Sequence, residues 1–296
     1  MTALDCVPCP RCYTAGTSSQ TTMNKLRPFS ILVYVLANAI GVLALVIPFV
    51  APALQTSQTQ GSPLFLALMI ALCFIALLLE AQGGAATAKF MALLGVLVAI
   101  NSVLRFIEVA IPGPGGFSPI FFLIILAGYV YGTQFGFLMG ALTLLISALT
   151  TGGIGPWLPA QMLTASWVGL SAGAVRILTA KLNLSEPVEI SILTVLGVLW
   201  GFLYGIFINL WFWPFVVGPA AQPAGADASI WPLIQRYTAY YLATSLVWDL
   251  ARALGNAIMM ASFGRPTLRA LRRFRHRFAF TYTVTPEPAD TATQVL

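Results

Sequence analysis

The sequence predicts an all-α protein, a polytopic transmembrane helical bundle of about eight spans. Apolar residues make up 58% of the 296-residue chain and charged residues only 8%. A soluble domain has about 25% charged residues, so most of this chain must be solvated by lipid. The apolar residues also fall in separate runs of about 20, the length that a helix needs to cross the hydrocarbon. We therefore expect a multi-pass protein of the cell membrane.

The predicted spans divide into an N-terminal hairpin and a core of six helices. The hairpin has few polar groups and ends at the break Gln82-Gly83-Gly84. In the core, Tyr131-Gly132-Thr133-Gln134 is expected to be a tight turn between two spans. The predicted spans are 30–54, 63–80, 88–111, two within 119–149, 159–179, 190–213 and 236–263. The corresponding divisions are a leader (1–29), the hairpin (30–87), the core (88–265) and a basic tail (266–296).

Lysine and arginine in short loops predict the orientation, because cytoplasmic loops are enriched in them. With eight spans, these residues fall on one side, so both termini are expected in the cytoplasm. The net charge of +6 therefore reflects a cytoplasmic flank, and no nucleic-acid partner is expected. The loops expected outside are 55–62, 112–118, 151–158 and 214–235. The basic residues that define the cytoplasmic side are Lys25, Arg27, Lys89, Arg176, Lys181 and the arginines of the tail.

The leader contains Cys6, Cys9 and Cys12 in a C-x2-C-x2-C pattern. Such a pattern could begin a zinc or iron–sulfur site, but no fourth Cys or His follows nearby. We interpret the segment as a disordered leader, or as sequence upstream of a start at Met23. No metal or cofactor is expected.

Polar residues inside the spans are functional candidates, because they are costly in hydrocarbon. Asn101, Arg105 and Glu108 share one face of the third span. They could form a local ion pair near the interface or the polar wall of an outward-facing pocket. Asp249 and Arg252 share a face of the eighth span.

Asp249 and Arg252 could neutralise each other, or Asp249 could pair with Arg105 between helices. Asn209, in the seventh span, is a further candidate for substrate binding.

Two outer segments rich in glycine and proline, 112–119 and 151–159, cannot form helices. Irregular backbone at membrane depth lies within protein or beside water. The segments could line a ligand mouth with Phe117, Trp157 and Gln161, or they could be ordinary loops with interfacial tryptophans.

Missing motifs argue against most enzymes. The single histidine, His276, lies in the tail, so a Ser–His protease or a His-ligated zinc centre is not expected within the membrane. No G-x-x-x-x-G-K-[ST] motif is present for ATP hydrolysis, and no D-D-x-x-D-like cluster for magnesium.

The predicted core contains five segments rich in glycine, proline and aromatic residues. They are Phe117-Ser118-Pro119-Ile120-Phe121-Phe122, Ala127-Gly128-Tyr129-Val130-Tyr131-Gly132, Phe135-Gly136-Phe137-Leu138-Met139-Gly140-Ala141-Leu142, Gly153-Ile154-Gly155-Pro156-Trp157-Leu158-Pro159-Ala160-Gln161-Met162 and Gly169-Leu170-Ser171-Ala172-Gly173. Together these segments resemble those of the membrane S component, the substrate-binding subunit of energy-coupling factor (ECF) transporters. The resemblance covers about 88–265 and matches the family's six-helix core.

The resemblance implies capture of a vitamin-like small molecule outside the cell and import by a transmembrane coupling subunit with two cytoplasmic ATPases. It also implies contact with the coupling subunit through an A-x-x-x-A pattern, matched here by Ala88 and Ala92. The aromatic outer mouth suits a flat ring system, and a cobalamin-like tetrapyrrole is the first substrate to consider. The alternative is an ion-coupled secondary transporter that uses Glu108 and Asp249, and a membrane-embedded enzyme is a third class.

Overall fold

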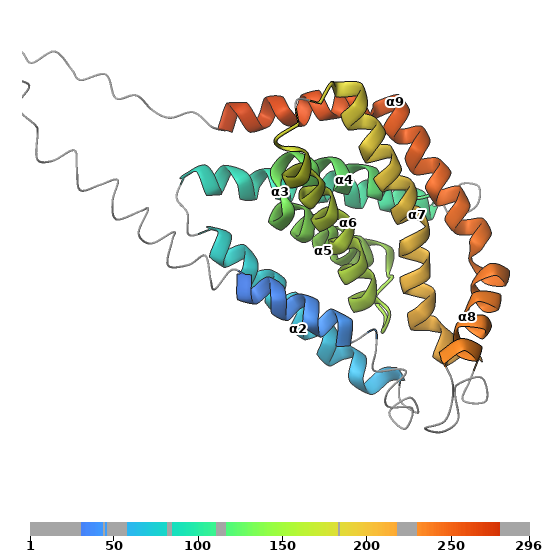
Figure 1. Ribbon diagram of the computed structural model, residues 1–296. Helices are drawn as coiled ribbons and strands as arrows, with labels where there is room; N and C mark the ends of the chain where they lie inside the picture. The colour runs from blue at the N-terminus through green and yellow to red at the C-terminus, as the bar shows by residue number, and fades with distance from the viewer. Residues whose placement is uncertain are drawn as a thin grey trace, which may run out of the picture.

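The computed structural model describes residues 31–43, 45, 58–81, 85–110, 117–182, 184–217 and 230–278. The cysteine leader, the Gln82-Gly83-Gly84 break, residues 112–116 of the first outer segment and the end of the tail lie outside these residues. All secondary structure in the described part is helical, which confirms the predicted fold class (Figure 1). A first helix, Ile31–Leu43, is followed by α2 (Gln58–Ala81), α3 (Ala85–Ala110), α4 (Ile120–Tyr131), α5 (Thr133–Thr151), α6 (Leu158–Thr179), α7 (Glu186–Val217), α8 (Ile230–Thr244) and α9 (Leu246–Phe278).

Four of the described helices are long and apolar enough to cross a membrane, namely Lys89–Ala110, Thr133–Thr151, Leu158–Thr179 and Glu186–Trp213. Three shorter apolar helices are Ile31–Leu43, Leu66–Leu79 and Ile120–Tyr131. The predicted eighth span, 236–263, is not one helix, because α8 ends at Thr244 and α9 begins at Leu246.

α9 also continues beyond the predicted core boundary to Phe278, with Pro266 inside it. Proline removes a helical hydrogen bond and bends a helix. Figure 1 shows α9 changing direction between its part along α7 and its C-terminal part.

The centre of the bundle is α4, in which every residue from Ile120 to Val130 is buried. The predicted turn after α4 is present: Gly132 has φ 106°, a conformation that favours glycine, and α5 begins at the next residue. Glycines then bring α5 and α6 into backbone contact. A Cβ atom on Gly136 or Gly169 would collide with the backbone of the other residue.

The N-terminal hairpin lies on one side of this core, away from α7 and α9 (Figure 1). Asn38 accepts a hydrogen bond of 2.6 Å from the indole N–H of Trp167 on α6. The ring of Tyr34 packs edge-on against Phe137 of α5, with 5.3 Å between centroids. The hairpin is therefore held by specific side-chain contacts as well as by apolar surface.

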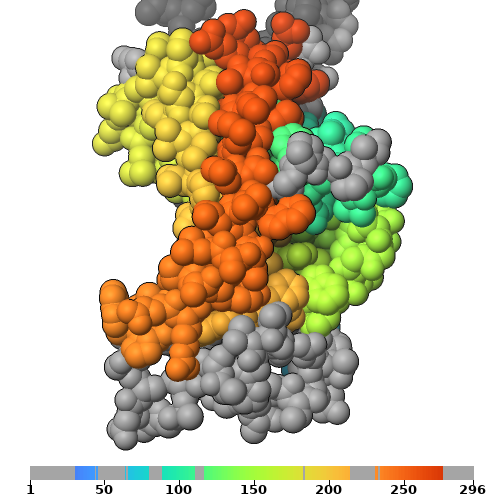
Figure 2. Space-filling view, turned by 90° about the vertical axis from the view of Figure 1, so that its right-hand side faces the viewer, coloured from blue at the N-terminus to red at the C-terminus, as the bar shows by residue number. Residues whose placement is uncertain are grey.

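On the other side of the core, α7 and α9 run antiparallel and in close contact. Gly197, Gly201 and Gly205, spaced four apart, form one face of α7. A Cβ atom on Gly201 would lie 2.5 Å from the Cα of Ala253. Figure 2 shows α9 running along this face of the molecule between α7 and α3. The glycine face lets α9 approach closely enough for its polar side chains to reach the backbone of α7.

Candidate functional site

Two ion pairs lie near each other where α3, α7 and α9 meet, and we call this group the membrane cluster. Arg105 pairs with Glu108 on α3, and Arg252 pairs with Asp249 on α9. Both are local i,i+3 pairs, and Arg105 does not pair with Asp249. Tyr204 of α7 lies between them: the guanidinium carbon of Arg252 is 5.3 Å from the centre of its ring, and the charges of both arginines act on its hydroxyl. The cluster therefore contains two positive and two negative charges within the predicted membrane region.

Asp249 has no exposed surface, yet its carboxylate has several donors. Besides Arg252, Tyr241 donates to Oδ2 at 2.8 Å and Ser245 at 3.3 Å. Asn209 of α7 donates in turn to the hydroxyl of Ser245 at 2.6 Å. The break between α8 and α9 falls at Ser245, so this residue supports the carboxylate at the point where the helix is interrupted. A buried charge with this many donors is adequately stabilised.

The α3 pair is tied to the beginning of α4. Ser118 donates to Glu108 at 2.8 Å, and the charge of Arg252 also acts on Glu108. The neighbouring Phe117 packs against Gly255 of α9, where a Cβ atom would overlap its ring. Phe117 and Ser118, near the end of the outer segment 112–119, therefore pack against the membrane cluster just before α4 begins.

Two buried polar atoms of α9 lack a hydrogen-bond partner among the described residues, Nε of Arg252 and Oδ1 of Asn256, as do Oδ1 of Asn101 and Oγ of Ser102 on α3. The amide nitrogen of Asn256 donates to the carbonyl oxygen of Gly197 at 2.9 Å, which fixes the orientation of the side chain. One donor and one acceptor, a turn apart on α9, are thus without a partner among the described residues. Buried polar atoms usually have partners, so these two atoms are exceptions that need an explanation.

The structure places the predicted site residues in three groups. Arg105, Glu108, Phe117, Asn209 and Asp249 lie together in or beside the membrane cluster. Asn101 does not: it is fully buried and joins α3 to its neighbours, donating to the carbonyl of Ile120 and the hydroxyl of Thr143, both at 3.2 Å.

Trp157 and Gln161 form the third group, at the beginning of α6. The ring centroids of Trp157 and Phe212 on α7 are 6.2 Å apart. The backbone carbonyl of Trp157 accepts a hydrogen bond from the backbone N–H of Gln161 at 3.0 Å.

Sequence reasoning missed Tyr204, Tyr241 and Ser245 as members of the site. Two of them carried a usable signal, because Tyr241, Ser245 and Asp249 are spaced four apart and share a helical face. Tyr204 carried none, since an aromatic residue in an apolar helix is ordinary. Among the described residues, no three His, Cys, Asp or Glu side chains gather as a metal site would require.

These features define the class: a helical membrane bundle that holds charged and hydroxyl side chains in its interior. Residues 89–262, more than half of the chain, match the family described as ECF transporter, substrate-specific component. The chain belongs to this family. Searches of curated proteins and of solved structures found no match.

Proposed function

We propose that the protein captures a vitamin-like small molecule at the membrane cluster and passes it to a coupling subunit and two ATPases for ATP-driven import. Family membership makes the chain a substrate-specific subunit. The observation that supports the location is the unpartnered pair a turn apart on α9, Nε of Arg252 and Oδ1 of Asn256.

The balance of charges in the membrane cluster favours a substrate without net charge. Two arginines and two carboxylates already pair with one another. An added net charge would leave one group without a partner, so an uncharged or zwitterionic ligand suits the cluster best. Aromatic rings flank it, including the edge-on pair of Phe121 and Tyr204 at 4.8 Å. A flat ring system with polar substituents fits these surroundings, and a cobalamin-like tetrapyrrole is the first compound to test.

Ligand binding by the purified protein tests the capture step. We expect saturable binding in isothermal titration without any partner subunit. Tyr204→Phe keeps the ring and removes one hydroxyl, and we expect it to weaken binding about tenfold through the loss of one hydrogen bond to the ligand. Tyr240→Phe makes the same change on α8 outside the cluster and should bind normally. Equal affinities for the two variants would exclude a ligand contact by this hydroxyl.

Contact with the coupling subunit is proposed for the A-x-x-x-A face of α3. Ala92 is exposed, and a Cβ atom on Gly95 would meet nothing within 4 Å, unlike the glycines of α5 and α6. The exposed side chains of Val96 and Val103 extend this apolar surface along the helix. Small residues of this kind let a partner helix approach closely. Ala88 belongs to the same face by its spacing, although its side chain lies outside the described residues.

Reconstituted transport tests the partner contact. With the coupling subunit and ATPases in liposomes, Ala92→Phe should abolish ATP-dependent uptake while ligand binding persists. Val195→Phe, at an exposed position of α7, is the matched control and should transport normally. Uptake by the isolated protein, driven by a proton or sodium gradient, would contradict the proposal and favour the ion-coupled alternative with Glu108 and Asp249.

A further inference from the structure

A second polar group lies at the opposite end of α7 and α9, where the predicted cytoplasmic loops are. A cavity of about 260 Å³ opens there between the ends of α4 and α6, the beginning of α7 and the C-terminal part of α9. A water molecule takes about 30 Å³ of the liquid, so the cavity admits a considerably larger group. We call this the arginine pocket. Its lining includes Tyr129, Arg176, Leu182, Glu189, Arg272 and Arg275.

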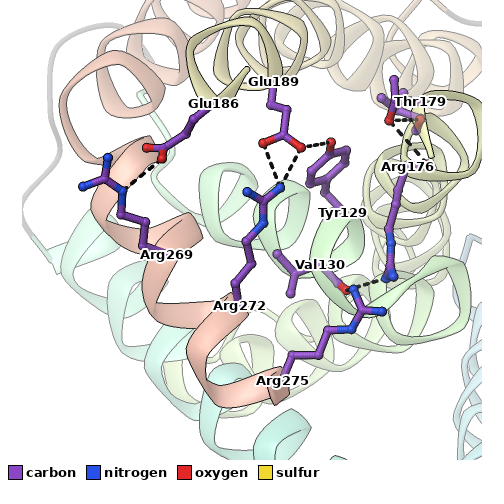
Figure 3. Close-up of polar contacts among 10 residues, drawn as sticks. Tyr129, Val130, Arg176, Thr179, Glu186, Glu189, Arg269, Arg272 and Arg275 are labelled. Atoms are coloured by element: carbon purple, nitrogen blue, oxygen red, sulfur yellow. Dashed lines mark hydrogen bonds and ion pairs between the residues drawn. The ribbon is translucent and has the colours of Figure 1, made fainter. Parts of the chain in front are cut away.

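The positive charges of the arginine pocket exceed its negative ones. Glu189 is engaged by two groups: Arg272 contacts both of its oxygens, at 2.6 and 2.8 Å, and Tyr129 donates to Oε1 at 2.8 Å. Among the described residues, neither Arg176 nor Arg275 pairs with a carboxylate. Both donate to the carbonyl oxygen of Val130, at 2.5 and 3.3 Å (Figure 3).

Two guanidinium groups that share one neutral oxygen repel each other, and each has five N–H donors of which Val130 occupies one. Figure 3 shows the side chains of Arg176 and Arg275 reaching this carbonyl from different helices. The remaining N–H groups of the two arginines could bind an anion with several oxygens, since arginine binds phosphate through paired N–H groups.

The residues around the arginine pocket favour a phospholipid over other anions. Leu182 of the lining is a large apolar side chain with 58% of its surface exposed, and Val130 and Ala180 add apolar lining beside the arginines. Apolar side chains beside a phosphate-binding fork suit a molecule with acyl chains. Anionic phospholipids also concentrate in the cytoplasmic leaflet, where the basic residues predict this end to lie.

We propose that the arginine pocket binds the phosphate of an anionic phospholipid, with the acyl chains leaving the pocket along Leu182. The C-terminal part of α9 is fixed over the pocket, because Tyr131 donates to the carbonyl of Leu271 at 2.8 Å. A bound lipid would join α6 to this part of α9 through Arg176 and Arg275. The proposal does not depend on the substrate or on transport.

Native mass spectrometry of the full-length protein tests this site, with phosphatidylglycerol, phosphatidylcholine and inorganic phosphate as probes. We expect the protein to retain phosphatidylglycerol about tenfold better than phosphatidylcholine, and Arg275→Gln or Arg176→Gln to remove this preference. Glutamine keeps an N–H donor for Val130, so folding should persist, and thermal unfolding without lipid verifies it. Arg273→Gln removes an equal charge from an exposed position of α9 outside the pocket and should retain the preference.

Two results would overturn the proposal. One is equal retention of phosphatidylglycerol by the wild type and by Arg275→Gln. The other is stabilisation by inorganic phosphate with no preference among the lipids, which would assign the pocket to a soluble phosphate instead. Arg275→Lys keeps the charge but loses the planar fork, and it should recover only part of the preference.

Discussion

The membrane cluster and the arginine pocket are built on the same pair of helices, α7 and α9, but they satisfy their charges differently. In the membrane cluster each arginine pairs with a carboxylate three residues away on its own helix, and the charges balance. In the arginine pocket, Arg272 of α9 pairs with Glu189 of α7, and Arg176 and Arg275 have no carboxylate partner in the described part of the chain. A balanced group can lie at membrane depth, whereas an excess of charge requires water or an anion. This difference in charge balance is why we propose an uncharged or zwitterionic ligand for the first group and an anion for the second.

The largest expected effect comes from unbalancing the membrane cluster. Asp249→Ala leaves Arg252, whose side chain is only 14% exposed, without its carboxylate. Removing one partner of a buried ion pair costs about 3–5 kcal/mol. The free energy of unfolding in a denaturant titration should fall by this amount. Arg252→Met added to Asp249→Ala removes the other charge and should restore most of the loss.

A loss below about 1 kcal/mol for Asp249→Ala would contradict the burial of this pair, since only exposed pairs contribute so little. It would show that water reaches Arg252 in the folded protein. The contrast with the arginine pocket would then disappear.

A smaller effect is expected from separating the helices that connect the two sites. Gly201→Ala places a Cβ atom 2.5 Å from the backbone of Ala253, so α9 must move away from α7. Overpacking of this kind costs about 1–3 kcal/mol. The movement would also weaken the bond of 3.2 Å from Arg252 to the carbonyl of Gly201. Both the unfolding free energy and ligand affinity should fall.

Gly95→Ala is the matched control on α3, because a Cβ atom there meets nothing. Alanine favours a helix over glycine by about 0.5–1 kcal/mol, so this variant should be slightly more stable than the wild type. Equal losses for Gly95→Ala and Gly201→Ala would mean that close approach of α7 and α9 is unimportant.

The sequence predicts the helices and turns of this molecule better than the contacts between them. Composition and run length predict the helices, and Gly132 predicts the turn between α4 and α5. Helical spacing also places Arg105 with Glu108 and Asp249 with Arg252. The break at Ser245 is not predicted, because one serine in an apolar run can also lie inside a helix with its hydroxyl bonded to a carbonyl of the preceding turn.

The arginine pocket could not be predicted for a different reason. Val130, Arg176, Glu189 and Arg275 come from four helices, and no spacing along the chain brings them together. The direction of α9 after Pro266 decides whether Arg275 reaches α4 or extends into solvent. A proline inside a helix predicts a bend but not where the helix then points.

The smallest expected effect comes from an exposed ion pair between α9 and α7, in which Nε of Arg269 lies 3.0 Å from a carboxylate oxygen of Glu186. The side chain of Arg269 is 69% exposed, so water competes for the pair. Glu186→Gln should therefore change the unfolding free energy by about 0–1 kcal/mol, and the difference should vanish at high salt. The loss in Asp249→Ala should persist at the same salt concentration, because a buried pair is poorly screened. Equal salt dependence for the two variants would show that the Asp249–Arg252 and Glu186–Arg269 pairs are equally exposed to water.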